Sequence, residues 1–181
     1  GTGAVTFTGN APSNILGSQA IQFYELKVNK GAGVALMLQT PVAVSQQISF
    51  NSGMLDLNGY DVDLGSTGVL NGEQESSRIL GSNGGEVIFN GTLNAPAGVN
   101  PGNLGILISS PQNLGNTVIR RGHQSQTNGS GVGSSVLRYY DITPANNGSL
   151  NAILRFRYFD AELNDQDENA LILWERTAAQ T

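Results

Sequence analysis

Acidic side chains form the densest group of potentially reactive residues in this sequence. Five of them, Asp160, Glu162, Asp165, Asp167 and Glu168, lie close together near the C-terminal end. Ca²⁺ prefers clustered carboxylate and carbonyl oxygens, so the cluster predicts a calcium site, although it lacks the spacing of a defined calcium-binding loop. The alternative is an acidic turn that keeps the end of a strand soluble. We expect no other cofactor.

The chain contains one histidine, His123, in a stretch rich in Gly and Ser next to Arg120 and Arg121. Cys is absent, so a metal site built from His and Cys ligands is excluded. No recognisable motif surrounds a Ser, His and Asp set of the kind that nucleophilic catalysis uses. We therefore expect His123 to be a solvated loop residue.

Five aromatic side chains are candidates for stacking against sugar rings: Tyr60, Tyr139, Tyr140, Tyr158 and Trp174. A sugar site needs at least two aromatic rings that face outward and lie roughly coplanar. Burial in the core is the alternative, and it is the stronger expectation for Tyr158 and Trp174.

Composition limits the partners that this chain can have. Charged residues make up only 13% of the 181 residues, and the net charge is -5. Nucleic acid and anionic membranes require a basic surface, which this chain lacks. No apolar run is long enough to span a membrane as a helix, so we expect no membrane insertion.

The structural elements that position these side chains are indicated by a short pattern that recurs about every 20 residues. It consists of apolar, any and apolar residues followed by Asn or a hydroxyl residue, and its copies end at residues 8, 29, 51, 71, 90 and 109. The second apolar positions are Phe7, Val28, Phe50, Leu70, Phe89 and Ile108. Apolar residues alternate within each period, which is typical of strands with one buried face. The sequence therefore predicts an all-β fold that begins with a parallel β-helix, or β-solenoid.

Four copies of the pattern end in asparagine: Asn29, Asn51, Asn71 and Asn90. Stacked coils would place their amides about 4.8 Å apart. We expect these side chains to form a ladder of hydrogen bonds from coil to coil. The alternative is an antiparallel β-sandwich in which the Asn-Gly pairs are hairpin turns.

The repeat also shows whether acidic residues recur at the same position in successive coils, as catalytic carboxylates could. Polysaccharide-cleaving enzymes built on β-helices set carboxylates close together on one sheet, and Asp61 and Asp63 are candidates for such a pair. Asp56 and Asp63 have Ala35 and Ala43 as counterparts one coil earlier, so acids do not stack in phase. We expect solvated surface acids and no enzymatic activity.

The predicted organisation has three parts: β-solenoid repeats over 1–122, a Gly/Ser-rich loop over 123–135 and an antiparallel β-meander over 136–181. The meander comprises strands at 136–142, 150–159 and 170–176. A solenoid needs a cap over its last coil, and the meander is either this cap or part of a β-sandwich.

Two segments resemble a known family. Residues 23–34, FYELKVNKGAGV, and 53–65, GMLDLNGYDVDLG, resemble repeats of large secreted surface proteins of Bacteroidota. Residues 138–142 and 154–164 resemble the β-region that follows such repeats. The resemblance implies a β-solenoid in an adhesin-like or filament segment, located outside the cell or at its surface.

Together these features predict a structural or adhesive extracellular module, which is a stiff cell-surface stalk or a filament subunit. The expected partners are neighbouring copies or domains of the same protein, including a homopolymer, and glycans. The alternative function is a carbohydrate-binding module of a secreted protein.

Overall fold

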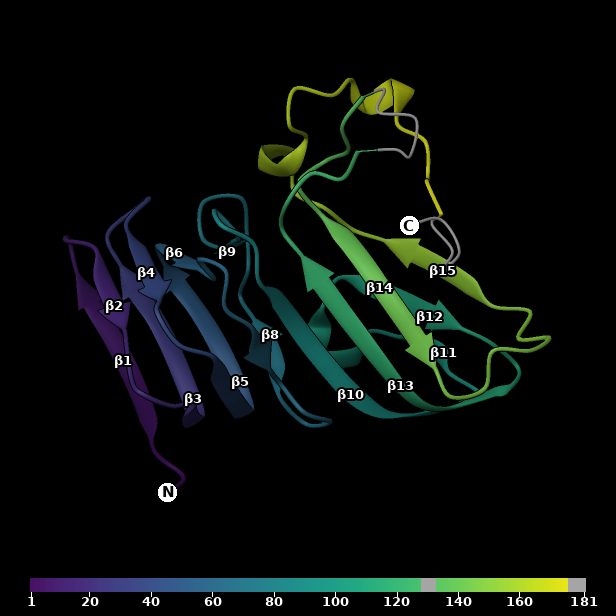
Figure 1. Cartoon of the computed structure of the whole chain (residues 1–181), viewed down its shortest axis with the longest axis horizontal. Helices are drawn as coiled ribbons and strands as arrows, with labels where there is room; N and C mark the ends of the chain where they lie inside the picture. The colour runs from purple at the N-terminus through teal and green to yellow at the C-terminus, as the bar shows by residue number, and fades with distance from the viewer. Residues whose placement is uncertain (128–132, 176–181) are drawn as a thin grey trace.

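The computed structural model describes residues 1–127 and 133–175. About half of the residues form strands, and the parallel part is a β-solenoid of about 4 turns with about 22 residues per turn. The predicted all-β solenoid fold is therefore confirmed (Figure 1). An antiparallel region follows the coils, as expected.

The described residues form three sheets. The main sheet has the order β1-β3-β5-β7-β10-β13-β14, and β8 also pairs with β5. Its strands are β1 (Ala4–Gly9), β3 (Ile21–Lys30), β5 (Val42–Ser52), β7 (Val62–Asp63), β8 (Val69–Asn71), β10 (Glu86–Asn94), β13 (Asn113–Gly122) and β14 (Tyr139–Pro144). The second sheet contains β2 (Ser13–Ile15), β4 (Ala35–Leu38), β6 (Met54–Asp56) and β9 (Ile79–Leu80). The third contains β11 (Ala97–Val99), β12 (Ile106–Ser109) and β15 (Ile153–Phe156).

The main and second sheets are the walls of the solenoid. Each coil contributes strands to both, and all pairs from β1 to β10 in the main sheet are parallel. Alternate side chains point between the walls, where Leu26, Val28, Leu36 and Leu38 are fully buried. Burying such side chains is worth roughly 1.5–3 kcal/mol each, so the period-2 pattern drives this part of the fold.

The predicted asparagine ladder is wrong. Asn29 pairs with Ser52, and Asn71 pairs with Ser49, so the pattern slips between successive coils. A different corner carries the expected kind of bond: Asn83 donates to the side chain of Asn58 at 2.7 Å, and Asn58 donates to the Leu38 carbonyl at 3.0 Å.

The phase of the later repeats also differs from the prediction. Leu70 lies beside Ile48 rather than Phe50, and β10 pairs with β7 at a step of 25 residues, from Val62 to Val87. Ile108 lies in an antiparallel strand. The parallel coils consequently end at β10, well before the predicted boundary at 122.

The C-terminal region covers the last coil but is not the predicted meander. β14 pairs with β13 in the main sheet, and β15 pairs with β12 in the third sheet, so the two strands belong to different layers. The 3₁₀ turn η1 (Pro101–Asn103) lies against the last coil, where Asn103 donates to the Leu70 carbonyl at 2.7 Å. Cap is thus the better description of this region.

Two predicted segments are partly outside the described residues. The loop over 123–135 includes residues 128–132, which lie outside them, and its described ends are joined by a bridge between Thr127 and Ser134. The strand expected over 170–176 is not formed in its described part: η3 (Glu168–Ala170) overlaps its start, and residues 171–175 have no regular structure. Arg176 lies outside the described residues. A third short turn, η2 (Asp160–Glu162), precedes η3.

Candidate functional site

Charged side chains from distant segments meet in a buried cluster between the coils and the cap, here called the ionic junction. Its members are Glu73, Arg121, His123, Arg138 and Glu162. Glu73 lies between β8 and β9, while Arg121 and His123 are at the end of β13. Arg138 precedes β14, and Glu162 is the last residue of η2. The junction therefore ties the coils to the C-terminal region.

Arg121 is the centre of the junction. Its side chain is 1% exposed, and its Nη1 and Nη2 atoms donate to the two carboxylate oxygens of Glu73, each at 2.9 Å. Nη1 also donates to the Leu104 carbonyl at 3.1 Å. Burial alone would raise the pKa of Glu73, but the charge of Arg121 and its hydrogen bonds outweigh this and lower it. Both groups are therefore charged at neutral pH.

His123 is buried, which contradicts the predicted solvated loop residue. Arg121 Nε donates to His123 Nε2 at 3.2 Å, so the proton of the neutral ring belongs on Nδ1. Nδ1 faces Glu162 Oε1 at 3.4 Å, a long contact for a hydrogen bond. Burial and the charge of Arg121 lower the pKa of His123 to about 4. With Nε2 occupied by an arginine, the ring has no free nitrogen to act as a base on a substrate.

Glu162 joins the junction to the cap. Its Oε1 accepts a hydrogen bond from Arg138 Nη2 at 2.8 Å, and its Oε2 accepts one from the Phe159 backbone N–H at 2.9 Å. Burial would raise the pKa of Glu162, but His123, Arg138 and this N–H together lower it to about 2. Arg138 also packs over the Phe159 ring at 5.0 Å.

The structure contradicts the predicted calcium site. Glu162 points into the junction, Asp167 accepts from the Asn169 N–H at 3.0 Å, and Glu168 accepts from the Tyr158 hydroxyl at 2.8 Å. Asp160 and Asp165 are exposed. Three of the five carboxylates are therefore engaged in separate contacts instead of facing one common point. Among residues 1–127 and 133–175, no group of three or more His, Asp or Glu residues is placed to hold a metal ion.

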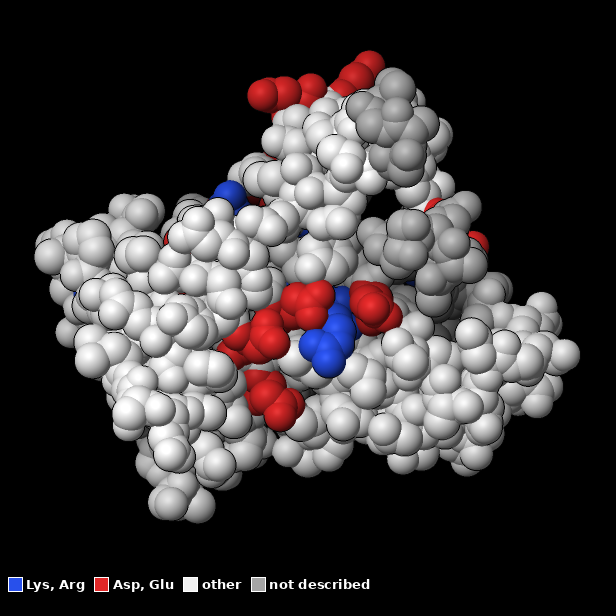
Figure 2. Space-filling view, in the orientation of Figure 1, with Lys and Arg blue, Asp and Glu red and all other residues white. Residues whose placement is uncertain are grey.

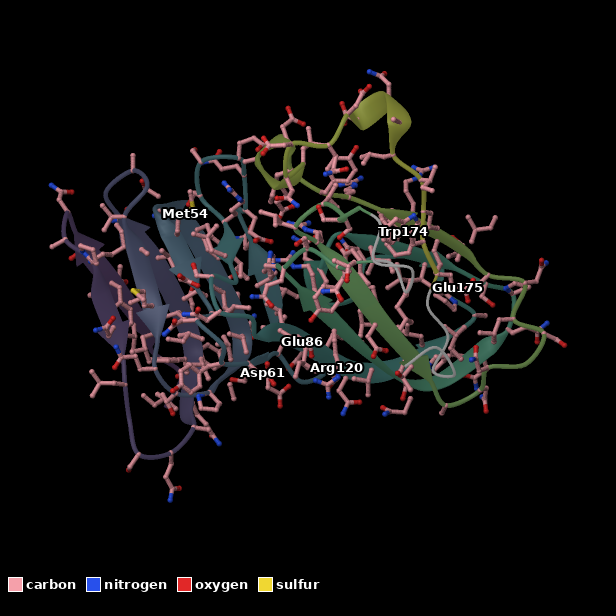
Figure 3. The ribbon with its side chains drawn as sticks, turned by 45° about the horizontal axis from the view of Figure 1, so that its top comes forward. Met54, Asp61, Glu86, Arg120, Trp174 and Glu175 are labelled. Atoms are coloured by element: carbon pink, nitrogen blue, oxygen red, sulfur yellow. The ribbon has the colours of Figure 1, made fainter. Side chains whose placement is uncertain are left out.

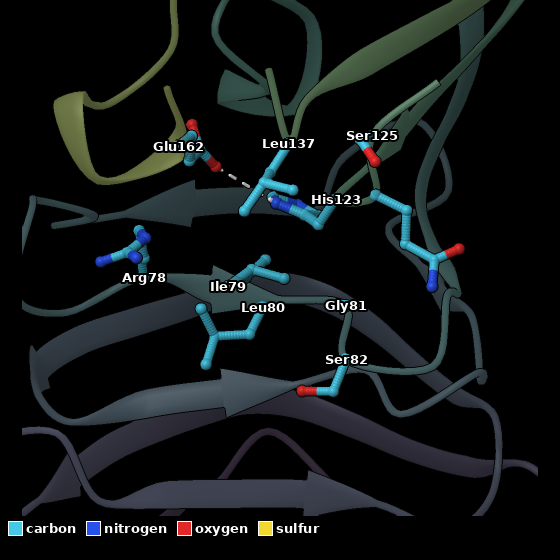
Figure 4. A pocket seen from close by; sticks show the side chains of 10 residues that line it. Arg78, Ile79, Leu80, Gly81, Ser82, His123, Ser125, Leu137 and Glu162 are labelled. Atoms are coloured by element: carbon cyan, nitrogen blue, oxygen red, sulfur yellow. Dashed lines mark ion pairs between the residues drawn. The ribbon is translucent and has the colours of Figure 1, made fainter. Parts of the chain in front are cut away.

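A shallow pocket adjoins the junction, with a cavity volume of about 470 Å³. Arg78, Leu80 and Ser82 line it from the coils, while His123 and Glu162 line it from the cap side (Figure 4). The Ser82 hydroxyl donates to Asp56 at 2.5 Å, and Glu162 is held by Arg138. The Ser82 and Glu162 side chains are therefore already engaged in holding the fold.

A second charged group lies on the outer face of the main sheet, where acidic side chains surround a basic one (Figure 2). Figure 3 shows Asp61, Glu86 and Arg120 side by side. Arg120 pairs with Glu86 at 3.1 Å, and the Tyr139 hydroxyl donates to the same carboxylate at 2.8 Å. Asp61 accepts from the Glu86 N–H at 2.9 Å. Asp61 thus links its own coil to the next one and does not form a carboxylate pair with Asp63.

The aromatic candidates do not gather into one platform. Tyr140 packs against Phe156 with ring centroids 5.3 Å apart, and its hydroxyl donates to the Leu104 carbonyl. Tyr60 and Trp174 are the exposed members, and Figure 3 shows Trp174 far from Asp61, the neighbour of Tyr60. Carbohydrate binding stays a prediction, without a paired platform among the described residues.

Comparisons with protein-family models, curated proteins and solved structures found no match. A proposal for the function of this chain must therefore rest on its own structure. Within the described residues, no helix is long and apolar enough to cross a membrane.

Sequence reasoning missed Glu73, Arg121 and Arg138 as members of a site. One signal was present: Ile119 and Arg121 alternate along β13, so they share one face, and His123 continues the same spacing directly after the strand ends. Nothing in the sequence identified Glu73 as the partner, because the two residues are 48 positions apart.

Proposed function

We propose that the chain is a non-enzymatic structural module of an extracellular or cell-surface stalk or filament, in which its coils continue end to end with neighbouring copies of the same protein. The observation that carries this proposal is the open edge of β1. Within the described residues, β1 pairs only with β3, so its outer backbone groups have no strand partner.

The first coil exposes apolar groups that are buried in later coils. Val5 and Phe7 pair with Leu26 and Val28, which are fully buried, so all four point toward the interior. Val5 is nevertheless 42% exposed because no strand covers it, and Leu16 is 66% exposed. A further coil would bury this end of the core.

The open edge also lacks the usual protection against pairing. Edge strands that must stay single commonly carry charged residues, proline or bulges. No charged side chain precedes Glu25 in the sequence, and β1 pairs with β3 without a bulge. The charges beside β1 belong to β3, where Glu25 and Lys27 pair with Ala4 and Thr6 and Lys30 donates to the Thr8 carbonyl at 2.8 Å. This end is therefore suited to accept another strand.

The opposite end is closed by the cap and the ionic junction. Two unlike ends favour head-to-tail contacts, which produce an open chain of subunits instead of a closed dimer. The uncharged polar composition and the resemblance to Bacteroidota surface repeats support a location outside the cell and an adhesive role. The hydrogen bond from Arg121 to His123 Nε2 and the burial of the ring support a role without catalysis.

Analytical ultracentrifugation over a wide concentration range, combined with negative-stain microscopy, tests the proposal. We expect a series of oligomers that lengthens with concentration, and rods one molecule wide. Val5→Lys places a charge on the exposed core and should shift the series toward monomer, whereas Thr6→Lys, on the outer face of the same strand, should shift it less. Uniform monomers at the highest soluble concentration would refute end-to-end assembly.

A further inference from the structure

Residues 171–175, Leu-Ile-Leu-Trp-Glu, have no regular structure and no strand partner among the described residues. Ile172 and Leu173 are each 76% exposed, and Trp174 is 41% exposed. Three consecutive large apolar side chains on a surface mark an interaction site more often than a free surface. The segment is therefore a candidate to pair with a sheet edge.

The open edge of β1 cannot receive this segment within one molecule. Figure 1 shows β1 at one end of the sheet and the C-terminal region at the other, separated by the whole solenoid. Figure 3 places Trp174 and Glu175 at the cap. A contact between the segment and β1 must therefore join two molecules.

We propose that residues 171–175 of one molecule add as a strand to the open edge of β1 in the next copy. This inference rests on the proposed function and identifies the contact that produces end-to-end assembly. Strand addition supplies backbone hydrogen bonds for affinity, while alternate side chains enter the core. Five extended residues span about 17 Å, and β1 has six residues, so the lengths match.

The side-chain pattern fits this arrangement in either strand direction. With Leu173 beside Thr6, the alternation places Ile172 and Trp174 over Val5 and Phe7. Of those two β1 side chains, Val5 is exposed and Phe7 is only partly buried in the first coil. The added strand would thus extend both the sheet and the core.

Charge favours the same pairing. Residues 1–52 contain Lys27, Lys30 and Glu25, a net charge of +1. Residues 136–181 contain four Arg and seven acidic residues, a net charge of -3. Opposite charges at the two ends speed association and disfavour contacts between two like ends.

Cross-linking provides a direct test, because the natural chain has no cysteine. Leu173→Cys is mixed with Thr6→Cys under mild oxidation, and separately with Ser66→Cys, an exposed position away from β1. We expect disulfide-linked heterodimers to form at least 10-fold faster with Thr6→Cys than with Ser66→Cys. Equal rates would overturn the inference.

A second experiment separates this inference from the proposed function. The double variant Ile172→Asp/Trp174→Asp changes exposed side chains, so circular dichroism should show an unchanged fold. Ultracentrifugation should show loss of the oligomer series. Persistent assembly of this variant would overturn the strand contact but leave end-to-end assembly intact, whereas a monomeric natural chain would overturn both.

Discussion

The guanidinium of Arg121 donates hydrogen bonds of 2.9 Å to both carboxylate oxygens of Glu73, which lies 48 residues earlier in the chain. This pair joins the loop after β8 to the end of β13, so it fixes the cap against the coils. A buried ion pair is rarely more stabilising than apolar residues of the same volume. Its two-point geometry instead holds the cap in one orientation relative to the coils.

Removing the Glu73 charge should destabilise the protein strongly. Glu73→Gln leaves Arg121 buried without its counter-charge, and we expect the free energy of unfolding to fall by about 3 kcal/mol. Glu75→Gln is the comparison in the same loop: Glu75 accepts hydrogen bonds from the Asp160 and Ala161 N–H groups at 2.9 and 3.0 Å but is exposed to solvent, so its loss should be smaller, about 1 kcal/mol. Urea unfolding followed by circular dichroism measures both, and similar losses would contradict the central role of Glu73.

The ionic junction should make the protein sensitive to acid. The pKa of His123 is about 4 in the folded state and 6.5 in the unfolded state, so the unfolded state binds its proton first as the pH falls. Stability should therefore decline between pH 6.5 and 4, by on the order of 2 kcal/mol at pH 4.5. The pKa of Glu162, about 2 against 4.5, adds a further loss as the pH falls from 4.5 toward 2.

His123→Gln isolates the first part of this effect, because glutamine keeps a polar side chain but cannot gain a proton in this range. Thermal melting of both proteins from pH 7 to 4 gives the measurement. The natural protein should lose stability between pH 6.5 and 4.5, while the variant should remain nearly constant there. A parallel decline of both proteins would assign the acid sensitivity to other groups.

The solenoid could be predicted from the sequence because alternating apolar residues specify one buried face per strand. The pairing register of the strands could not be predicted in the same way. The spacing between repeats along the chain gives only the sum of strand and loop lengths. The copy ending at Asn90 follows the copy ending at Asn71 by 19 residues, yet β10 pairs with β7 at a step of 25. The loop that carries Glu73 and Glu75 lengthens this coil and moves every later strand out of phase.

The ionic junction was harder to predict for a related reason. From sequence alone, Arg121, Glu162 and Arg138 would be expected at the surface, because charged residues are usually exposed. Only the three-dimensional packing brings them together away from water. The acidic turn illustrates the reverse case: clustering along the sequence suggested a calcium site, but Glu162 turns inward toward Arg138 while Asp160 and Asp165 stay exposed.

Gly68 should be indispensable for the coil corner. A Cβ atom at this position would lie 2.3 Å from the Val44 carbonyl oxygen and 2.6 Å from the Leu64 carbonyl oxygen, both backbone atoms that cannot move aside. We expect Gly68→Ala to lower the free energy of unfolding by about 2 kcal/mol or more. Gly148→Ala, where a Cβ atom meets nothing within 4 Å, should be near neutral in the same urea experiment. A neutral Gly68→Ala would mean that the two coils are not packed this closely.

Asp56 should matter through its hydrogen bonds and not through catalysis. It is 5% exposed, and its carboxylate accepts bonds from the Asn58 N–H at 3.0 Å and from the Ser82 N–H at 3.1 Å in the next coil. Because Asp56→Asn turns one acceptor oxygen into a donor among these donors, we expect a loss of about 2 kcal/mol in unfolding free energy. Asp63→Asn is the control, since Asp63 is exposed and accepts only from the Gly65 N–H. Hydrogen exchange should locate the weakening at the amides of Asn58 and Ser82, and unchanged protection of both amides would show that Asp56 does not hold the two coils together.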